Sequence, residues 1–160
     1  GQRRQSAQES IALFAAGGDY GQHADTEVLA FAMIETAEAM ENLDEIVSTP
    51  GLDGVYIGPA DLTLGLTGRK YPMGFDRQEP EMVAAIQLVL KKAKAAGIRA
   101  CLHNGSPEYA AKAVSWGFDL VTISSDVRLL AGAAQQSVSQ TRKLIGEAPA
   151  ASAGKTSNGY

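Results

Sequence analysis

Polar side chains gather at four points of this sequence, each directly after a short apolar run. Glu35 follows the first run, Asp61 closes the segment Gly58-Pro59-Ala60-Asp61 after the second, His103 follows the third, and serines 124–125 follow the fourth. Two carboxylates without a cluster of histidines and cysteines form a hard, oxygen-only donor set. Such a set favours Mg²⁺ or Mn²⁺, with Co²⁺ as an alternative. The first two points therefore predict a divalent-metal site built from Glu35 and Asp61.

A site with so few protein ligands leaves coordination positions for water and for a chelating substrate. A 2-oxo acid offers a carboxylate oxygen and a keto oxygen, and the metal then acts as a Lewis acid on the enolate formed when a C3–C4 bond breaks. The small residues Gly58 and Ala60, on either side of Pro59, would let backbone N–H groups approach the substrate carboxylate. We therefore expect Gly58, Pro59 and Ala60 to bind substrate.

Each polar residue also has a structural interpretation. Glu35 fits the first turn of a helix, and Asp61 fits the cap of a helix that follows a Pro-containing loop. His103 is typical of a hydrogen-bonded packing residue at a strand end, and Asp126 of a helix cap. His23 lies in a polar stretch and is expected at the surface. Taken one at a time, these residues do not decide between structure and chemistry.

The apolar runs that precede the polar points predict the strands of a parallel sheet. They cover residues 29–34, 54–57, 98–102 and 120–123, and none shows the polar alternation of a sheet with one wet face. Short continuous runs of this kind indicate strands buried on both faces. Helical spacing follows them over residues 39–47, 80–96, 107–116 and 128–145, with Ser106 and Pro107 as a strong helix start.

The predicted order is one helix and then four strand–helix units, an α/β chain. The spacing is close to the roughly 30 residues per unit of a (β/α)₈ TIM barrel of about 250 residues. Four units make half a barrel, which has two open sheet edges and an uncovered interior and so needs a partner half or another subunit. The alternative is a small doubly wound sheet, although no Gly-rich phosphate loop follows the first run. In a barrel, Glu35 and Asp61 would meet at the carboxyl ends of neighbouring strands.

Composition sets the remaining limits. The chain has 160 residues, 45% hydrophobic and 20% charged, which is ordinary globular usage. A formal charge of −4 gives no basic surface for nucleic acid or anionic lipid, and no apolar run approaches the roughly 20 residues that span a membrane. One cysteine, Cys101, fits a reducing cytoplasm.

The domain boundaries follow from the same sequence. We expect a partial barrel domain over residues 1–147 and a flexible tail over residues 148–160. We also expect a missing beginning before Gly1, because no Met or signal-like segment opens the chain.

Four ordered motifs strongly resemble the HpcH/HpaI aldolase family. The first two cover residues 33–46 and 51–63, and contain Met-Ile-Glu-Thr-Ala-Glu-Ala and Gly-Val-Tyr-Ile-Gly-Pro-Ala-Asp-Leu. The other two cover residues 103–110 and 117–126, with His-Asn-Gly-Ser-Pro-Glu-Tyr-Ala and Gly-Phe-Asp-Leu-Val-Thr-Ile-Ser-Ser-Asp. The match runs from about residue 18 to residue 145, so it spans most of the chain.

The resemblance implies the C-terminal half of a metal-dependent class II aldolase on a TIM barrel, hexameric in the family. Members cleave or form 4-hydroxy-2-oxo acids, with pyruvate as the common product. By motif, Glu35 and Asp61 match the metal ligands, and Gly58 and Ala60 match the residues that hold the pyruvate carboxylate. The expected partners are a pyruvate-type 2-oxo acid and further copies of the chain.

Several departures from the family pattern limit this assignment. The family's first half carries a proton-transfer His and an enolate-stabilising Arg that have no counterpart here, and His103 matches a different position, on the penultimate strand. We therefore expect no catalytic residue in this chain and no activity from it alone. The usual Gly-x-Arg-Ser-Phe-Gly segment fits only at residues 1–3, Asp25 replaces a frequent Asn, and Met33 replaces a Gln found in some members.

Two other functions compete with the aldolase. One is a C–C lyase for acyl-CoA thioesters, of the citrate lyase or malyl-CoA lyase type, which uses a similar acidic pair. The Pro-Glu-Tyr-Ala segment and the lack of a basic surface for CoA phosphates favour the simple oxo acid. The other is a non-catalytic fragment that binds metal weakly or serves as an assembly module.

Overall fold

The computed structural model describes residues 19–147 and divides the chain into two compact units, Gly1–Ala30 and Phe31–Tyr160. In the described part of the first unit, helix α2 (Tyr20–Glu27) carries His23 on its surface, 3.6 Å from Asp19. The surface position predicted for His23 is confirmed. The predicted tail of residues 148–160 and the segment compared at residues 1–3 lie outside the described residues.

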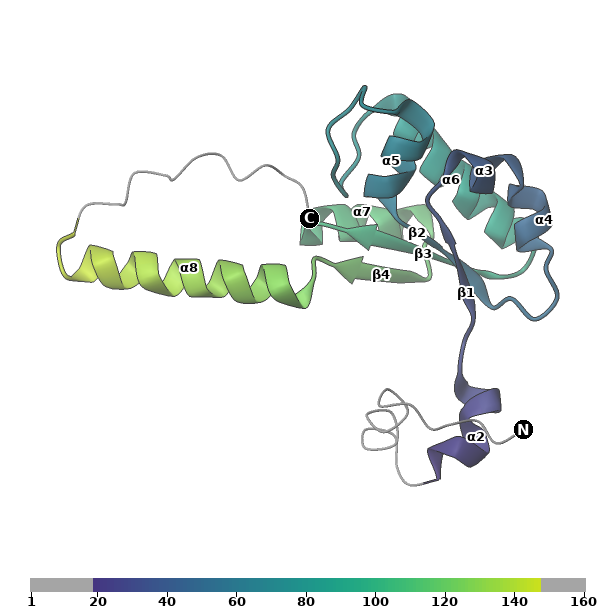
Figure 1. Cartoon of the computed structure of the whole chain (residues 1–160), viewed down its shortest axis with the longest axis horizontal. Coiled ribbons are helices and arrows are strands. Elements are labelled where there is room, and N and C mark those ends of the chain that lie inside the picture. The colour runs from purple at the N-terminus through teal and green to yellow at the C-terminus, as the bar shows by residue number, and fades with distance from the viewer. Residues whose placement is uncertain (1–18, 148–160) are drawn as a thin grey trace. The chain divides into compact units, whose positions relative to one another are not determined.

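The second unit is built on a parallel sheet of four strands. These are β1 (Phe31–Ile34), β2 (Gly54–Ile57), β3 (Arg99–Asn104) and β4 (Leu120–Ile123), hydrogen-bonded in the order β1-β2-β3-β4 (Figure 1). Because right-handed crossovers between strands in sequential order all fall on one face, this order is that of a barrel segment. A doubly wound sheet reverses its strand order partway. The unit therefore has the fold of half a TIM barrel.

The helices between the strands cover one face of the sheet (Figure 1), whereas the helix after the last strand, Asp126–Leu144, has no buried residue. Most of them start with proline or with a capping serine or threonine. The N–H groups of a first helical turn have no acceptor within the helix; proline has no N–H to leave unpaired, and the cap hydroxyl accepts from one of these groups. The helices of this unit are α3 (Ala37–Glu41), α4 (Leu43–Val47), α5 (Pro59–Thr67), α6 (Pro80–Ala95), α7 (Pro107–Trp116) and α8 (Asp126–Leu144). None of the helices within residues 19–147 is both long and apolar enough to cross a membrane.

Several boundaries differ from the sequence prediction. Strand β1 begins at Phe31, two residues after the predicted start, and α8 covers Asp126–Leu144 in place of residues 128–145. The helix expected over residues 39–47 is two helices that meet at Asn42, whose side-chain amide donates to the Glu38 carbonyl at 2.9 Å. Strand β3 continues two residues further than predicted, to Asn104. Asp126 is not the cap of α8: Ser125 is, since its hydroxyl accepts from the Arg128 N–H, and Asp126 is the first helical residue.

One apolar cluster joins the sheet to its helices. Alternate strand residues enter it, such as Val55 and Ile57 from β2 and Ala100 and Leu102 from β3, because successive side chains of a strand point to opposite faces. Helix α6 adds the stripe predicted from its spacing, with Met82, Ile86, Val89, Leu90 and Ala93 buried.

The opposite face of the sheet carries a different set of side chains. Met33 on β1 and Leu120 on β4 are 54% and 48% exposed there, while Tyr56 and His103 between them are half-buried. This is the face that becomes the interior of a closed barrel. Exposed apolar side chains therefore lie on the two edge strands of this face, and half-buried polar side chains lie on the two inner strands.

Gly54 is required where β1, β2 and β3 pair. A Cβ added there would lie 2.3 Å from Phe31 Cε1 and 2.6 Å from the Arg99 carbonyl oxygen, and the latter belongs to the backbone. We expect Gly54→Ala to lower the free energy of unfolding by about 1–3 kcal/mol, as overpacking does. Urea unfolding measures this. The matched control is Gly132→Ala in α8, where no atom lies within 4 Å and the change is expected to be neutral or stabilising. Equal stability of the two variants would contradict the prediction.

Candidate metal centre

The strand register brings the polar residues of the sequence into one row. Ile34, Ile57, Leu102 and Val121 are partners across the four strands. The next residue of each strand therefore lies at the carboxyl edge of the sheet, and the set is Glu35, Gly58, His103 and Thr122. Since side chains alternate along a strand, the side chains of Glu35, His103 and Thr122 lie on the face opposite the helices. Of the predicted site residues, Glu35 and Gly58 thus occupy neighbouring strand ends, while Pro59, Ala60 and Asp61 lie in the first turn of α5.

Glu35 lies between β1 and helix α3, and it is half-buried. The cap of α3 is Thr36, whose hydroxyl accepts from the Ala39 N–H at 3.0 Å, so Glu35 precedes the helix. The interpretation of Glu35 as an acidic residue of the first helical turn is wrong; that position belongs to Glu38. No helix-dipole role then accounts for Glu35.

Two glycines hold the neighbouring elements close to Glu35. A Cβ on Gly58 would lie 3.0 Å from Glu35 Oε2 and 3.7 Å from Met33 Cε. A Cβ on Gly65 of α5 would lie 3.1 Å from the Thr36 Cα and the Ala37 nitrogen. The Glu35 carboxylate therefore lies next to the end of β2, in space that a side chain at position 58 would fill. Helix α5 packs directly against the backbone of the turn after Glu35.

Asp61 is in the first turn of α5, half-buried, and not at its cap. Helix α5 begins at Pro59 with Gly58 as its N-cap, so the interpretation of Asp61 as a cap is wrong. Pro59 and Ala60 are buried. Pro59 has no N–H, so any backbone donation to an anion here falls to groups such as the Ala60 N–H, which lies in the first turn where N–H groups lack intrahelical acceptors.

This arrangement fits a divalent cation. Glu35 follows β1, Asp61 lies in the first turn of the helix that follows β2, both are half-buried carboxylates, and the space beside Glu35 is kept open by Gly58. Within residues 19–147 there is no group of three or more His, Cys, Asp and Glu side chains suited to a metal ion. The described part of the chain can thus offer a pair of carboxylates, which leaves most coordination positions of a hard cation for other ligands. The metal role of the pair stays a prediction.

His103 is hydrogen-bonded at the ends of β2, β3 and β4. Its Nδ1 lies 2.9 Å from the Tyr56 hydroxyl and 2.8 Å from the Thr122 hydroxyl, and these hydroxyls are 2.8 Å apart. Phe75 meets the imidazole edge-on, with ring centroids 4.3 Å apart. The hydrogen-bonded packing role expected for His103 is confirmed. Burial, with a further contribution from the Arg128 charge, lowers the pKa of His103 below its usual 6.5, against a smaller opposite effect of Asp76.

The lowered pKa of His103 predicts a pH dependence of stability. Because the fold disfavours the protonated ring, the unfolded chain binds the proton more tightly. The contribution of neutral His103 is complete above the ordinary pKa of 6.5 and is lost as the pH falls through the lower pKa of the folded state. We expect the free energy of unfolding to decrease between pH 7.5 and 5, and His103→Gln to reduce this decrease. Urea unfolding at both pH values tests it, and identical slopes in the two proteins would contradict it. The exposed His23 is common to both and serves as internal control.

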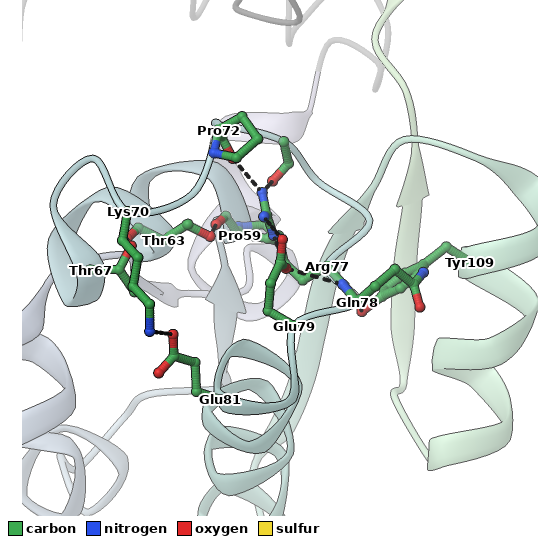
Figure 2. Close-up of polar contacts among 11 residues, drawn as sticks. Pro59, Thr63, Thr67, Lys70, Pro72, Arg77, Gln78, Glu79, Glu81 and Tyr109 are labelled. Carbon is green, nitrogen blue, oxygen red and sulfur yellow. Dashed lines mark hydrogen bonds and ion pairs between the residues drawn. The ribbon is translucent and has the colours of Figure 1, made fainter.

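A segment between α5 and α6 packs against the same edge of the sheet, and the sequence did not reveal its role. Arg77 is 4% exposed, donates to both Glu79 oxygens at 2.6 and 3.1 Å, and also donates to the Pro72 and Gly74 carbonyls (Figure 2). The Tyr109 hydroxyl of α7 donates to the Arg77 carbonyl at 2.7 Å. A buried arginine cannot be recognised from its local sequence, because arginine is normally exposed.

Asp76, next to Arg77, joins this segment to the end of β3. Its carboxylate accepts from the Gly105 N–H at 2.7 Å and from the Ser106 hydroxyl at 2.6 Å. Ser106 in turn caps α7 by accepting from the Tyr109 N–H, as predicted. The segment that carries Phe75 is therefore fixed beside His103.

The family profile and the similar curated sequences all match this chain to aldolases. The sequence profile of the family described as HpcH/HpaI aldolase/citrate lyase matches residues 3–133. The chain is 43% identical over 128 residues to a hydroxypyruvate/pyruvate aldolase of Rhizorhabdus wittichii, covering 80% of this chain and 50% of that protein. It is 35% identical to a 4-hydroxy-2-oxo-heptane-1,7-dioate aldolase of Shigella sonnei, covering 73% and 43%.

Solved structures give the same result. An HpcH/HpaI aldolase/citrate lyase family protein from Burkholderia cenocepacia aligns with a TM-score of 0.67 at 30% identity, covering 89% of this chain and 53% of that one. An HpcH/HpaI aldolase from Desulfitobacterium hafniense aligns with a TM-score of 0.68 at 25% identity, covering 82% and 49%. The chain spans about half the length of the curated relatives it matches.

Proposed function

Because this chain belongs to the HpcH/HpaI aldolase/citrate lyase family, we propose that it supplies the metal-binding half of a class II aldolase. The proposed reaction cleaves a 4-hydroxy-2-oxo acid to pyruvate and an aldehyde. The observation that carries the proposal is the position of the Glu35 carboxylate, 3.0 Å from where a Gly58 Cβ would lie, with Asp61 in the first turn of the adjacent helix. Glu35 precedes helix α3 and is not in its first turn, and Asp61 is not the cap of α5, although it lies in the first turn of that helix.

In the proposed site, the residues of this chain bind the metal and orient the substrate. Glu35 and Asp61 hold Mg²⁺ or Mn²⁺, with Co²⁺ as an alternative, through oxygen ligands. A cation there would polarise the keto oxygen of the 2-oxo acid and stabilise the negative charge that develops as the C3–C4 bond breaks. Gly58 and Pro59 leave room for the substrate carboxylate, and the Ala60 N–H at the start of α5 donates to it.

Proton transfer and stabilisation of the enolate by arginine belong to the other half of the barrel in this proposal. We therefore expect the 160-residue chain alone to bind metal without catalysing cleavage. Residues 1–147 act as the partial barrel domain, and copies of the whole protein form a homo-oligomer. These features are expectations from the family resemblance and the open sheet face.

The experiment is an assay of pyruvate release from a 4-hydroxy-2-oxo acid by the protein that carries this half-barrel. Release should require Mg²⁺ or Mn²⁺, stop when a chelator is added, and resume when the metal is restored. Activity that survives chelation would rule out the metal-dependent mechanism. Cleavage of an acyl-CoA thioester in place of the oxo acid would favour the acyl-CoA lyase, and absence of both reactions would favour a non-catalytic assembly role.

A further inference from the structure

His103 and Thr122 are the polar side chains of the strand-end row that the proposed chemistry does not use, and of the two only His103 carries a ring nitrogen. Counting along that row, it lies on the same face and at the same level as Glu35 and Gly58, two strands from Glu35. Neighbouring strands are about 4.8 Å apart, so the two backbones are roughly 10 Å apart across the site. A 2-oxo acid that chelates a metal near Glu35 does so through its carboxylate and keto oxygens, on its first two carbons. Its remaining carbons then extend either along the sheet edge or away from it. His103 lies along that edge.

The surroundings of His103 fix the ring and leave one nitrogen for a ligand. Nδ1 is satisfied by the hydroxyls of Tyr56 and Thr122, at 2.9 and 2.8 Å. Phe75 covers one side of the imidazole, with centroids 4.3 Å apart. Within residues 19–147, no hydrogen bond to Nε2 is found. Among the described residues, the buried side-chain N and O atoms that lack a partner do not include Nε2, so this nitrogen is open to water or to a ligand.

We propose that His103 determines which aldehyde the site accepts, by hydrogen-bonding through Nε2 to a hydroxyl group of that aldehyde. This inference rests on the proposed function and adds the substrate class to it: a small hydroxyaldehyde in preference to an alkyl aldehyde. A hydroxyl is the matching group because it both donates and accepts. It therefore pairs with Nε2 whichever of the two neutral tautomers the Tyr56 and Thr122 hydroxyls select. Tyr56 and Thr122 are positioning residues that act through His103.

The test compares glycolaldehyde with propanal, which differ by a hydroxyl in place of a methyl group. Each is added to pyruvate in the aldol direction, using the protein that carries this half-barrel with Mn²⁺. The measured quantity is the ratio of kcat/KM for glycolaldehyde to kcat/KM for propanal. A site that hydrogen-bonds a substrate hydroxyl discriminates strongly against the analogue without it. We expect the ratio to favour glycolaldehyde in the unchanged protein.

Two isosteric variants separate the proposed role from a structural one. The amide nitrogen of glutamine reaches the position of Nε2, whereas that of asparagine reaches only the position of Nδ1. We expect His103→Gln to keep the ratio within about threefold and His103→Asn to lower it by about 10–100-fold, the effect of losing a buried hydrogen bond to the substrate. If His103 served only to pair with Tyr56 and Thr122, the order would be reversed.

The opposite order of the two variants would overturn the inference, as would equal losses with both aldehydes. Exchange of the pyruvate C3 protons with deuterated solvent, followed by NMR without any aldehyde, separates the two levels of the proposal. Metal-dependent exchange with no hydroxyl preference would refute the role of His103 while leaving the proposed function intact. Absence of exchange in the unchanged protein would refute both.

Discussion

Replacing Glu35 and Asp61 together by alanine is expected to lower the Mn²⁺ affinity of the 160-residue chain by at least about 100-fold. The reason is that both protein ligands of the proposed site are removed, and even groups that only support a ligand change metal affinity by about 10–100-fold. In the protein that carries this half-barrel, pyruvate release should fall by about 10³-fold or more, because positioned charge stabilisation is usually the largest catalytic contribution.

Titration of Mn²⁺ followed by the relaxation rate of water protons measures the affinity directly, without requiring catalysis by the isolated chain. The matched control is Glu38→Ala with Glu41→Ala, two exposed acids on α3 that remove the same charge from the same region. The control should bind Mn²⁺ as the unchanged chain does. If the control loses affinity equally, general electrostatic attraction explains the binding; if the Glu35 and Asp61 variant keeps full affinity, the metal assignment is wrong.

The structure assigns to other residues the helix positions that the sequence allowed for Glu35 and Asp61. From the sequence, Glu35 had a plausible place in a first helical turn and Asp61 a plausible place at a cap. The fold gives those places to Glu38 and Gly58. What periodicity could not provide was the exact start of each helix, since an N-cap depends on local backbone angles that several neighbouring polar residues could adopt. Ser125 in place of Asp126 at the start of α8 is the same kind of error.

The sheet was more accessible to sequence reasoning than its connections were. The runs over residues 54–57 and 120–123 are strands with the predicted bounds, because short apolar runs favour strands of a parallel sheet. The prediction that all the strands are buried on both faces is wrong for β1 and β4, where Met33 and Leu120 are exposed at the edges of the sheet. The order of strands followed from the repeated strand–helix units. The attachment of the segment around Arg77 to the end of β3 and to α7 was not predicted, since those contacts join residues more than 25 positions apart and no local pattern encodes them.

His103 illustrates an intermediate case. Its place at the end of a strand and a hydrogen-bonded role were both predictable. Its partners, Tyr56 and Thr122, come from two other strands and become neighbours only through the register. The sequence carries these residues at alternate positions of apolar runs, where a polar side chain in a parallel strand is unusual. That signal would have marked the inner face of the barrel in advance.

Replacing Arg77 by alanine is expected to lower the free energy of unfolding by about 3–5 kcal/mol, the cost of breaking a buried ion pair by removing one partner. Glu79 is 24% exposed and would lose the guanidinium that lowers its pKa, and the Pro72 and Gly74 carbonyls would lose their donor (Figure 2). Urea unfolding at neutral pH measures the change. The matched control is Arg99→Ala, because Arg99 is 70% exposed and 3.6 Å from Asp119, a pair expected to contribute less than about 1 kcal/mol.

A second variant separates the ion pair from the packing around it. Adding Glu79→Gln to Arg77→Ala removes the charge that has lost its guanidinium, so we expect the double variant to recover part of the lost stability. A double variant less stable than Arg77→Ala would show that the remaining bond from the Gln78 N–H to the Glu79 carboxylate, at 3.2 Å, outweighs the unpaired charge. Because Phe75 and Asp76 precede Arg77, loss of this anchor should also loosen the contact of Phe75 with His103 and of Asp76 with Gly105 and Ser106. The His103 ring would then be more exposed to water, and its pKa should rise toward 6.5, which NMR titration of the imidazole protons can follow. An unchanged pKa would mean that the segment is held beside His103 by Asp76 without Arg77.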